Sequence, residues 1–237
     1  MKSRYLQIII VIFVLIIGII LRVFLLGKVP VSPDWDEVAL GYNAYSILET
    51  GRDEYGQIFP VVLESFDDYK PALYAYLIIP FLKIFDLSVI AVRLPSVILG
   101  CISLLILYFI IRELFPKGIE YEKLKISRNT LAAISMLFFA IAPWHIQFSR
   151  VGFEAQAGLS FNLIFILSFL KGLKKYYLLP LSAFFAGLSI YVYQSEKVYV
   201  PILLLLLIGV FWKDYIKIPR KWIVTAFITG VLVIFPM

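Results

Sequence analysis

The sequence predicts a polytopic membrane protein made of α-helices, and its composition and apolar runs carry that prediction. Of the 237 residues, 62% are hydrophobic and 16% are charged, and the mean hydropathy is +0.92. Soluble domains are about 45–50% apolar and about 25% charged. The apolar residues form runs separated by charged stretches, which is the pattern of successive membrane spans. This composition excludes both a water-soluble fold and a disordered chain.

The charge and the rare residue types exclude several kinds of site. The formal net charge is +6, but Lys and Arg gather in the cytoplasmic loops of membrane proteins, so we predict no nucleic-acid partner. Cys101 is the only cysteine and lies in an apolar run, which excludes a disulfide framework. His145 is the only histidine, so a histidine-rich metal site is excluded, and a structural role for this residue is favoured.

The first predicted span is Leu6–Leu26, and the basic residues before it place the N-terminus in the cytoplasm. This run is longer than the apolar core of a signal peptide, and no small-residue cleavage site follows it. Further apolar runs raise the expected bundle to about seven spans, and they are Leu94–Ile111, Thr130–Phe148, Ala155–Leu170, Tyr177–Tyr193, Val198–Trp212 and Trp222–Met237. Since the last run reaches the chain end, we expect a C-terminal truncation.

Pro71–Phe85 is apolar but short, and Pro80 and Lys83 interrupt it. If it does not cross the bilayer, the cytoplasmic side holds 14 of the 22 Lys and Arg residues, in residues 1–5, 112–130, 171–176 and 213–221. The first outer loop, residues 27–92, then holds 10 of the 16 acidic residues. Because cytoplasmic loops are the basic ones, we predict that Pro71–Phe85 is an interfacial helix at the outer leaflet of the cell membrane.

With this topology, three polar stretches share the extracytoplasmic face: residues 27–92, His145–Glu154 and Gln194–Lys197. The first contains Asp34, Asp36 and Glu37 just before a predicted helix at Val38–Leu48. For Asp34 we favour a helix-capping role. A carboxylate of Asp36 or Glu37, beside Trp35 at the membrane rim, can take a proton from a substrate hydroxyl.

Lys70 allows two interpretations, and the other polar residues allow a structural one. Lys70 follows Asp67, Asp68 and Tyr69, and it is either a snorkelling anchor or a point charge for a phosphate. Arg150 and Glu154 are four residues apart, so on a continuous helix they would form an ion pair. Interfacial Tyr residues are commonly membrane anchors, and we favour this role for Tyr177 and Tyr199. The sequence contains no glycine-rich phosphate loop and no HExxH zinc motif.

In order and spacing, these clusters resemble the membrane-embedded GT-C glycosyltransferases, in particular the bacterial members related to protein O-mannosyltransferases and aminoarabinose lipid A transferases. The resemblance covers residues 1 to about 201. Its motifs are Asp36-Glu37 after the first span, Lys70-Pro71-Ala72-Leu73, Arg93-Leu94-Pro95-Ser96 with Gly100, and Pro143-Trp144 with Phe148-Ser149-Arg150 and Glu154. Ala72 replaces the second proline of the family's Lys/His-Pro-Pro-Leu element, and Glu154 stands where some relatives carry Asp.

The resemblance implies one transmembrane glycosyltransferase domain over residues 1–237. Such an enzyme moves a hexosyl or pentosyl group from a polyprenyl-phosphate donor to a protein, lipid or glycan acceptor on the extracytoplasmic side, and in-line displacement inverts the anomeric centre. We assign Asp36 as the general base, with support from Glu37. Lys70 and Arg150 would bind the donor phosphate, and Glu154 would orient Arg150 or the acceptor. Tyr69, Tyr193 and Gln194 are the expected substrate-binding residues.

Two points stay open from the sequence. The acidic loop could hold a divalent cation, although no ligand spacing requires one. A transporter or a protein that handles a lipid carrier is the alternative function class. Transporters commonly carry ionisable residues inside their spans, and the predicted spans contain a single charged residue, Arg22. This feature favours the transferase.

Overall fold

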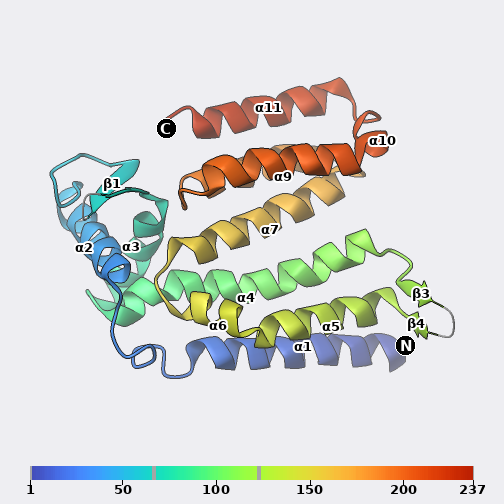
Figure 1. Cartoon of the computed structure of the whole chain (residues 1–237), viewed down its shortest axis with the longest axis horizontal. Coiled ribbons are helices and arrows are strands. Elements are labelled where there is room, and N and C mark those ends of the chain that lie inside the picture. The colour runs from blue at the N-terminus through green and yellow to red at the C-terminus, as the bar shows by residue number, and fades with distance from the viewer. Residues whose placement is uncertain (1, 66–67, 122–123, 237) are drawn as a thin grey trace.

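The computed structural model describes residues 2–65, 68–121 and 124–236, and most of them are helical. The long helices lie roughly side by side in one bundle (Figure 1). Its helices are α1 (Lys2–Val23), α4 (Val89–Leu114), α5 (Arg128–Ile141), α6 (Pro143–Arg150), α7 (Glu154–Gly172), α8 (Leu179–Ile190), α9 (Glu196–Val210) and α11 (Arg220–Ile234). The short helices η1 (Tyr176–Leu178) and α10 (Trp212–Tyr215) lie in the connections. The prediction of a helical membrane protein is confirmed in this coarse form.

Among the described residues, three helices are long and apolar enough to cross a bilayer. They are the Tyr5–Val23 part of α1, α4 and α7. The pair α5 and α6, bent by 59° at the break between them, makes a fourth candidate. The other predicted spans correspond to Tyr176–Ile190, α9 and α11, which are shorter. The expected count of seven spans is therefore not confirmed.

Helix α4 begins at Val89, before the apolar run that the sequence pattern delimits. Ser88 caps it, since its side chain accepts a hydrogen bond from the amide of Ala91. Arg93 consequently lies within a candidate span, fully buried. The expectation that Arg22 is the only charged residue in the spans is therefore wrong. The charge of Arg93 is tolerated because it pairs with the carboxylate of Glu37.

Two antiparallel hairpins accompany the helices, which the all-α prediction did not include. Strand β1 (Val62–Ser65) pairs with β2 (Asp68–Pro71), and β3 (Ile119–Tyr121) pairs with β4 (Leu124–Ile126). The first hairpin places Lys70 on a strand, opposite the buried Leu63. Asp67, which the sequence groups with Asp68, lies outside the described residues.

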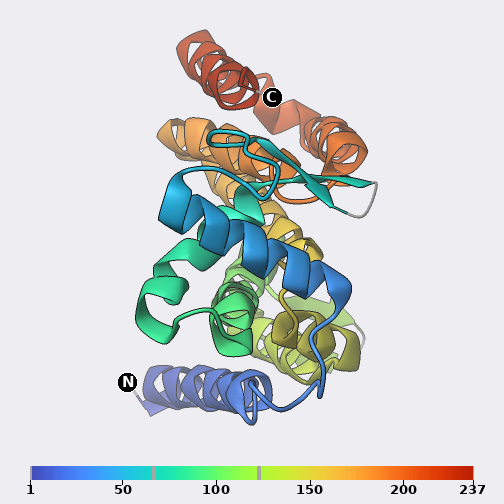
Figure 2. The same ribbon diagram turned by 90° about the vertical axis from the view of Figure 1, so that its left-hand side faces the viewer.

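A cap made of α2 (Trp35–Thr50), α3 (Leu73–Phe85) and the β1–β2 hairpin covers one end of the bundle. Figure 2 shows α2 lying across this end. Helix α3 confirms the short helix expected at Pro71–Phe85, and α2 begins earlier than expected, with Asp34 as its N-cap. Burial of Tyr74 and Ile78 joins the cap to the bundle. The cap is thereby fixed against the bundle.

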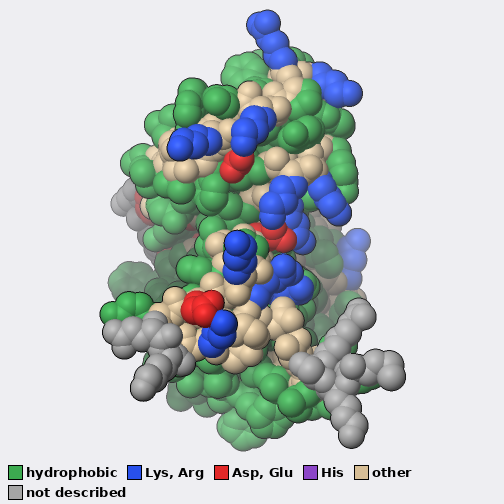
Figure 3. Space-filling model, turned by 90° about the vertical axis from the view of Figure 1, so that its right-hand side faces the viewer, with side chains coloured by type: hydrophobic (Ala, Val, Ile, Leu, Met, Phe, Trp, Pro, Cys, Tyr) green, Lys and Arg blue, Asp and Glu red, His purple; other side chains and the backbone are tan. Residues whose placement is uncertain are grey.

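The two ends of the bundle carry different charges, as the topology argument requires. The stretches expected in the cytoplasm contain the β3–β4 hairpin and α10, which lie at the end opposite the cap (Figure 1). Lys and Arg side chains gather on this end (Figure 3). Residues 27–92, which contain most of the acidic residues, form the cap and the connections around it.

We expect a cysteine at Gln57 to be labelled from outside intact cells and one at Lys125 to be labelled only after permeabilisation, because basic loops stay inside. Both side chains are exposed. Gln57 is preferable to its neighbour Gly56, whose φ of 87° strains any other residue. The background variant is Cys101→Ala, which removes the only native thiol. Labelling of both positions from the same side would contradict the topology.

Candidate functional site

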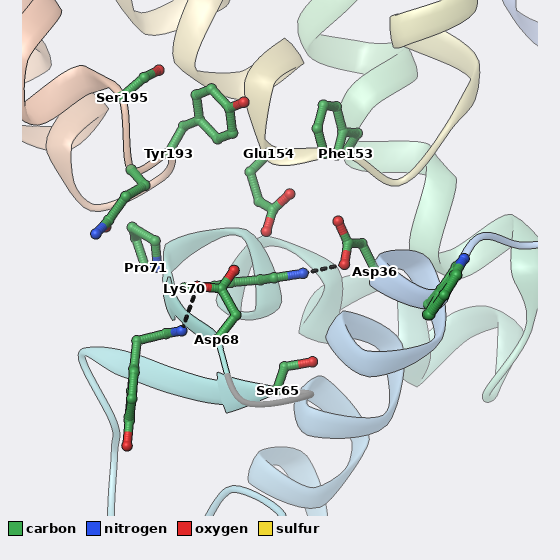
Figure 4. A pocket seen from close by; sticks show the side chains of 12 residues that line it. Asp36, Ser65, Asp68, Lys70, Pro71, Phe153, Glu154, Tyr193 and Ser195 are labelled. Carbon is green, nitrogen blue, oxygen red and sulfur yellow. Dashed lines mark hydrogen bonds and ion pairs between the residues drawn. The ribbon is translucent and has the colours of Figure 1, made fainter.

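A cavity of about 600 Å³ lies where the cap meets the start of α7 and the segment before α9 (Figure 4). Its volume falls in the usual range for small-molecule sites. Its lining residues are Trp35, Asp36, Ser65, Asp68, Tyr69, Lys70, Pro71, Phe153, Glu154, Tyr193, Gln194 and Ser195. Six of the eight predicted site residues are among them, namely Asp36, Tyr69, Lys70, Glu154, Tyr193 and Gln194. Glu37 and Arg150 are not part of this lining.

Asp36 and Lys70 form an ion pair inside the cavity (Figure 4). Asp36 lies in the first turn of α2, and Lys70 lies on β2. The exposed fractions of the two side chains are 32% for Asp36 and 15% for Lys70. This partial burial strengthens the attraction relative to a surface pair, because less solvent screens it.

Glu154 provides a second carboxylate in the cavity, and its residue is only 3% exposed. It is the first residue of α7, where the helix dipole favours a negative charge. Its carboxylate points toward the Asp36–Lys70 pair (Figure 4), and it interacts electrostatically with Lys70, Asp36 and Asp68. No ion pair to Glu154 is formed within the described part of the chain. Because its carboxyl group is not engaged in an ion pair, Glu154 is available to a substrate.

Aromatic rings form much of the remaining wall. Phe153 stacks on Phe148 at a centroid distance of 5.7 Å and meets Tyr193 edge-on at 5.9 Å. Trp35 and Tyr69 are 72% and 59% exposed. Rings of this kind offer apolar faces beside polar groups. The cavity therefore combines aromatic surfaces with carboxylates and the ammonium group of Lys70.

Glu37 stands next to Asp36 in the sequence but contacts other parts of the chain, and it links three elements. Its carboxylate accepts hydrogen bonds from Arg93 Nε at 2.8 Å and Nη2 at 3.0 Å. It also accepts from the backbone amides of Gly152 at 2.7 Å and Asp34 at 3.1 Å. Glu37 thereby ties the start of α2, which carries Asp36, to α4 and to the connection that precedes Glu154.

Two buried arginines hold the end of α1 and the connection between α1 and α2. Arg93 donates to the carbonyls of Leu26, Pro30 and Ser32, and Arg150 donates to those of Leu21, Arg22, Phe24 and Val29. Arg93 is part of a sequence motif but is not among the predicted site residues. Its position beside an apolar run is a signal that could have identified it, because a charged residue buried there requires a partner.

The expected ion pair between Arg150 and Glu154 is wrong. Arg150 ends α6 and Glu154 begins α7, and Val151 and Phe153 between them are extended. The spacing argument needed one continuous helix to bring the two side chains together. The guanidinium of Arg150 instead donates to four backbone carbonyls, and Arg150 is not among the described residues that line the cavity.

Two further buried groups support the site from behind. The hydroxyl of Tyr74 on α3 contacts the carbonyl of Val92 at 3.1 Å and the hydroxyl of Ser96 at 2.6 Å. Burial raises the pKa of Tyr74, so this hydroxyl stays protonated and donates. His145 is fully buried and contacts Arg22 and Phe139, which agrees with a structural role.

Sequence reasoning did not single out Ser65, Phe153 and Ser195, which also line the cavity. These neutral residues carry no charge or motif that marks a site, and only the folded chain brings them together. Within the described residues, no group of three or more His, Cys, Asp and Glu side chains is arranged to hold a metal ion.

A family model described as dolichyl-phosphate-mannose-protein mannosyltransferase matches residues 69–237. No curated protein and no solved structure shows significant similarity to the chain. The matched region contains Lys70, Glu154 and Tyr193, while Asp36 and Glu37 precede it.

Proposed function

The chain belongs to the dolichyl-phosphate-mannose-protein mannosyltransferase family of membrane-embedded GT-C glycosyltransferases, and on this premise we propose that it transfers a sugar from a polyprenyl-phosphate donor to an acceptor on the extracytoplasmic side. The observation that carries the proposal is the cavity between the cap and the bundle, which brings Asp36, Lys70 and Glu154 together from three separate parts of the sequence. The acceptor is a hydroxyl or amine of a protein, lipid or glycan.

Lys70 is the proposed contact of the donor phosphate. A lipid-linked donor stays in the bilayer, so its phosphate must be met at the membrane rim. Lys70 lies just before α3, the proposed interfacial helix, and it is the only Lys or Arg among the described residues that line the cavity. An ammonium group is a suitable point charge for a phosphate.

The proposed chemistry is one direct displacement. Asp36 takes the proton of the acceptor as the acceptor oxygen or nitrogen attacks the anomeric carbon. The bond between that carbon and the phosphate oxygen breaks, and polyprenyl phosphate leaves with the electron pair. Lys70 stabilises the negative charge that develops on this phosphate. Attack opposite to the leaving group inverts the anomeric centre.

Glu154 and the neutral residues have binding roles in this proposal. Glu154 accepts hydrogen bonds from the acceptor or from sugar hydroxyls, because its carboxylate faces the cavity and forms no ion pair with any residue that the structure describes. Tyr69, Tyr193 and Gln194 contact the substrates from the cavity wall. In the proposed orientation the chain lies in the cell membrane with its N-terminus in the cytoplasm and this cavity on the outer side. The basic residues at the opposite end of the bundle support this orientation.

The test of this function is a transfer assay with the purified chain in lipid nanodiscs. A panel of radiolabelled polyprenyl-phosphate hexoses and pentoses is offered with protein, lipid and glycan acceptors. We expect label in one acceptor class and release of unlabelled polyprenyl phosphate. Absence of transfer across the panel, together with solute or lipid-carrier flux in proteoliposomes, would favour the transporter or carrier-handling alternative.

Replacing Lys70 with Ala should raise the KM for the donor by about 10-fold or more, because hydrogen bonds to charged groups contribute roughly 1.5–3 kcal/mol. Lys70→Arg should retain part of the donor affinity, since the charge persists with altered geometry. Initial rates as a function of donor concentration measure both effects. A Lys70→Ala enzyme with the wild-type KM would show that Lys70 is only a membrane anchor.

A further inference from the structure

The Asp36–Lys70 ion pair occupies the same ammonium group that the donor phosphate needs. We propose that the donor phosphate displaces Asp36 from Lys70, so that the carboxylate becomes available as a base only when the donor is bound. This inference rests on the proposed function and adds an order of events to it. The donor binds first, and acceptor activation follows.

The donor phosphate and Asp36 compete for Lys70 because the two arginines near the site already have other partners. The guanidinium of Arg93 is held by Glu37 and by three carbonyls. That of Arg150 is held by four carbonyls. Within the described lining, Lys70 is therefore the group that can compensate an incoming phosphate.

The surrounding negative charge opposes simultaneous binding of the Asp36 carboxylate and the donor phosphate to the ammonium group of Lys70. Asp36 and Asp68 line the cavity together with Lys70. A phosphate placed at Lys70 adds negative charge next to these carboxyl groups, and like charges at a few ångströms repel each other strongly at partial burial. The repulsion favours movement of the Asp36 carboxylate away from the phosphate.

The exchange needs only side-chain movement. The backbone of Lys70 is fixed by the β1–β2 register, where it lies opposite the buried Leu63. The backbone of Asp36 is fixed by the first turn of α2 and by the bonds of Glu37. Both charged groups remain accessible from the cavity, since neither side chain is fully buried.

The functional consequence is a coupling between the two substrates. In the ion pair, the ammonium group of Lys70 occupies an oxygen of the Asp36 carboxylate. Release by the donor phosphate frees this oxygen to accept the proton of the acceptor at the moment when a sugar is in place to be attacked.

The test is a double-mutant cycle on ligand binding. The full chain in detergent micelles is titrated with a polyprenyl monophosphate, and with the neutral polyprenol of equal length to isolate the phosphate contribution. Asp36→Asn should bind the polyprenyl monophosphate at least about 5-fold more tightly than wild type, as expected for removal of a competing ion pair worth about 1 kcal/mol. In a Lys70→Ala background the same substitution should have no such effect.

Asp68→Asn is the matched control, because it removes another cavity carboxylate with the same change of charge. If Asp36→Asn and Asp68→Asn tighten binding equally, or if the effect of Asp36→Asn persists without Lys70, the exchange is overturned while the proposed function stands. If wild type binds the monophosphate no better than the polyprenol, the lipid-phosphate donor itself is wrong. An unchanged or weaker affinity of a folded Asp36→Asn protein also overturns the exchange.

Discussion

Asp36→Asn should lower the rate of sugar transfer by at least about 100-fold, because loss of a general base typically costs a factor of 10²–10⁴. The amide fills the space of the carboxylate but cannot take the acceptor proton. Asp36 occupies the first turn of α2. The hydrogen bond that caps this helix runs from the amide of Asp34 to the carboxylate of Glu37, so the side chain of Asp36 takes no part in it. The helix should therefore form as in wild type. Single-turnover rates at saturating donor and acceptor measure the chemical step.

Two further variants decide whether this loss belongs to Asp36. Asp68→Asn removes a neighbouring carboxylate of the same cavity and should lose much less activity. Glu154→Gln tests the other candidate base, which is more deeply buried. An Asp36→Asn enzyme with near-normal turnover and an inactive Glu154→Gln enzyme would assign the base to Glu154. Near-normal turnover in both would remove the catalytic role from this pair of carboxyl groups.

The sequence allowed much of the candidate site to be predicted because charge is costly in a bilayer. Basic loops had to lie on one side, so the acidic loop and the two shorter polar stretches had to share the other. The sequence therefore predicts Asp36, Lys70 and Glu154 at one surface. The cavity contains all three. Their catalytic and binding roles stay proposals.

Other features depend on contacts between residues far apart in the sequence. Glu37 stands next to Asp36, yet it points to Arg93 and to the amide of Gly152. Arg150 finds its partners in the last turn of α1 and in the connection that follows, and a break in the helix separates it from Glu154. Periodicity describes neighbours on one continuous element, so it could not identify these partners.

Replacing Arg93 with Leu should have the largest effect on stability, because removing one partner of a buried ion pair costs about 3–5 kcal/mol. Glu37 would keep a carboxylate that is 3% exposed and has lost its guanidinium. The carbonyls of Leu26, Pro30 and Ser32 would lose their donor. Unfolding in mixed micelles with an increasing fraction of SDS measures the loss.

The exposed pair of Lys125 with Glu120 provides the matched control, since its side chains are 76% and 67% exposed. Lys125→Leu should change stability by less than about 1 kcal/mol. The double variant Arg93→Leu/Glu37→Leu should lose less than the sum of its two single variants, because neither charge is then left buried alone. If Arg93→Leu unfolds like Lys125→Leu, the ion pair does not hold α2 to α4. Asp36 and Glu154 must then be positioned by the apolar contacts of the cap alone.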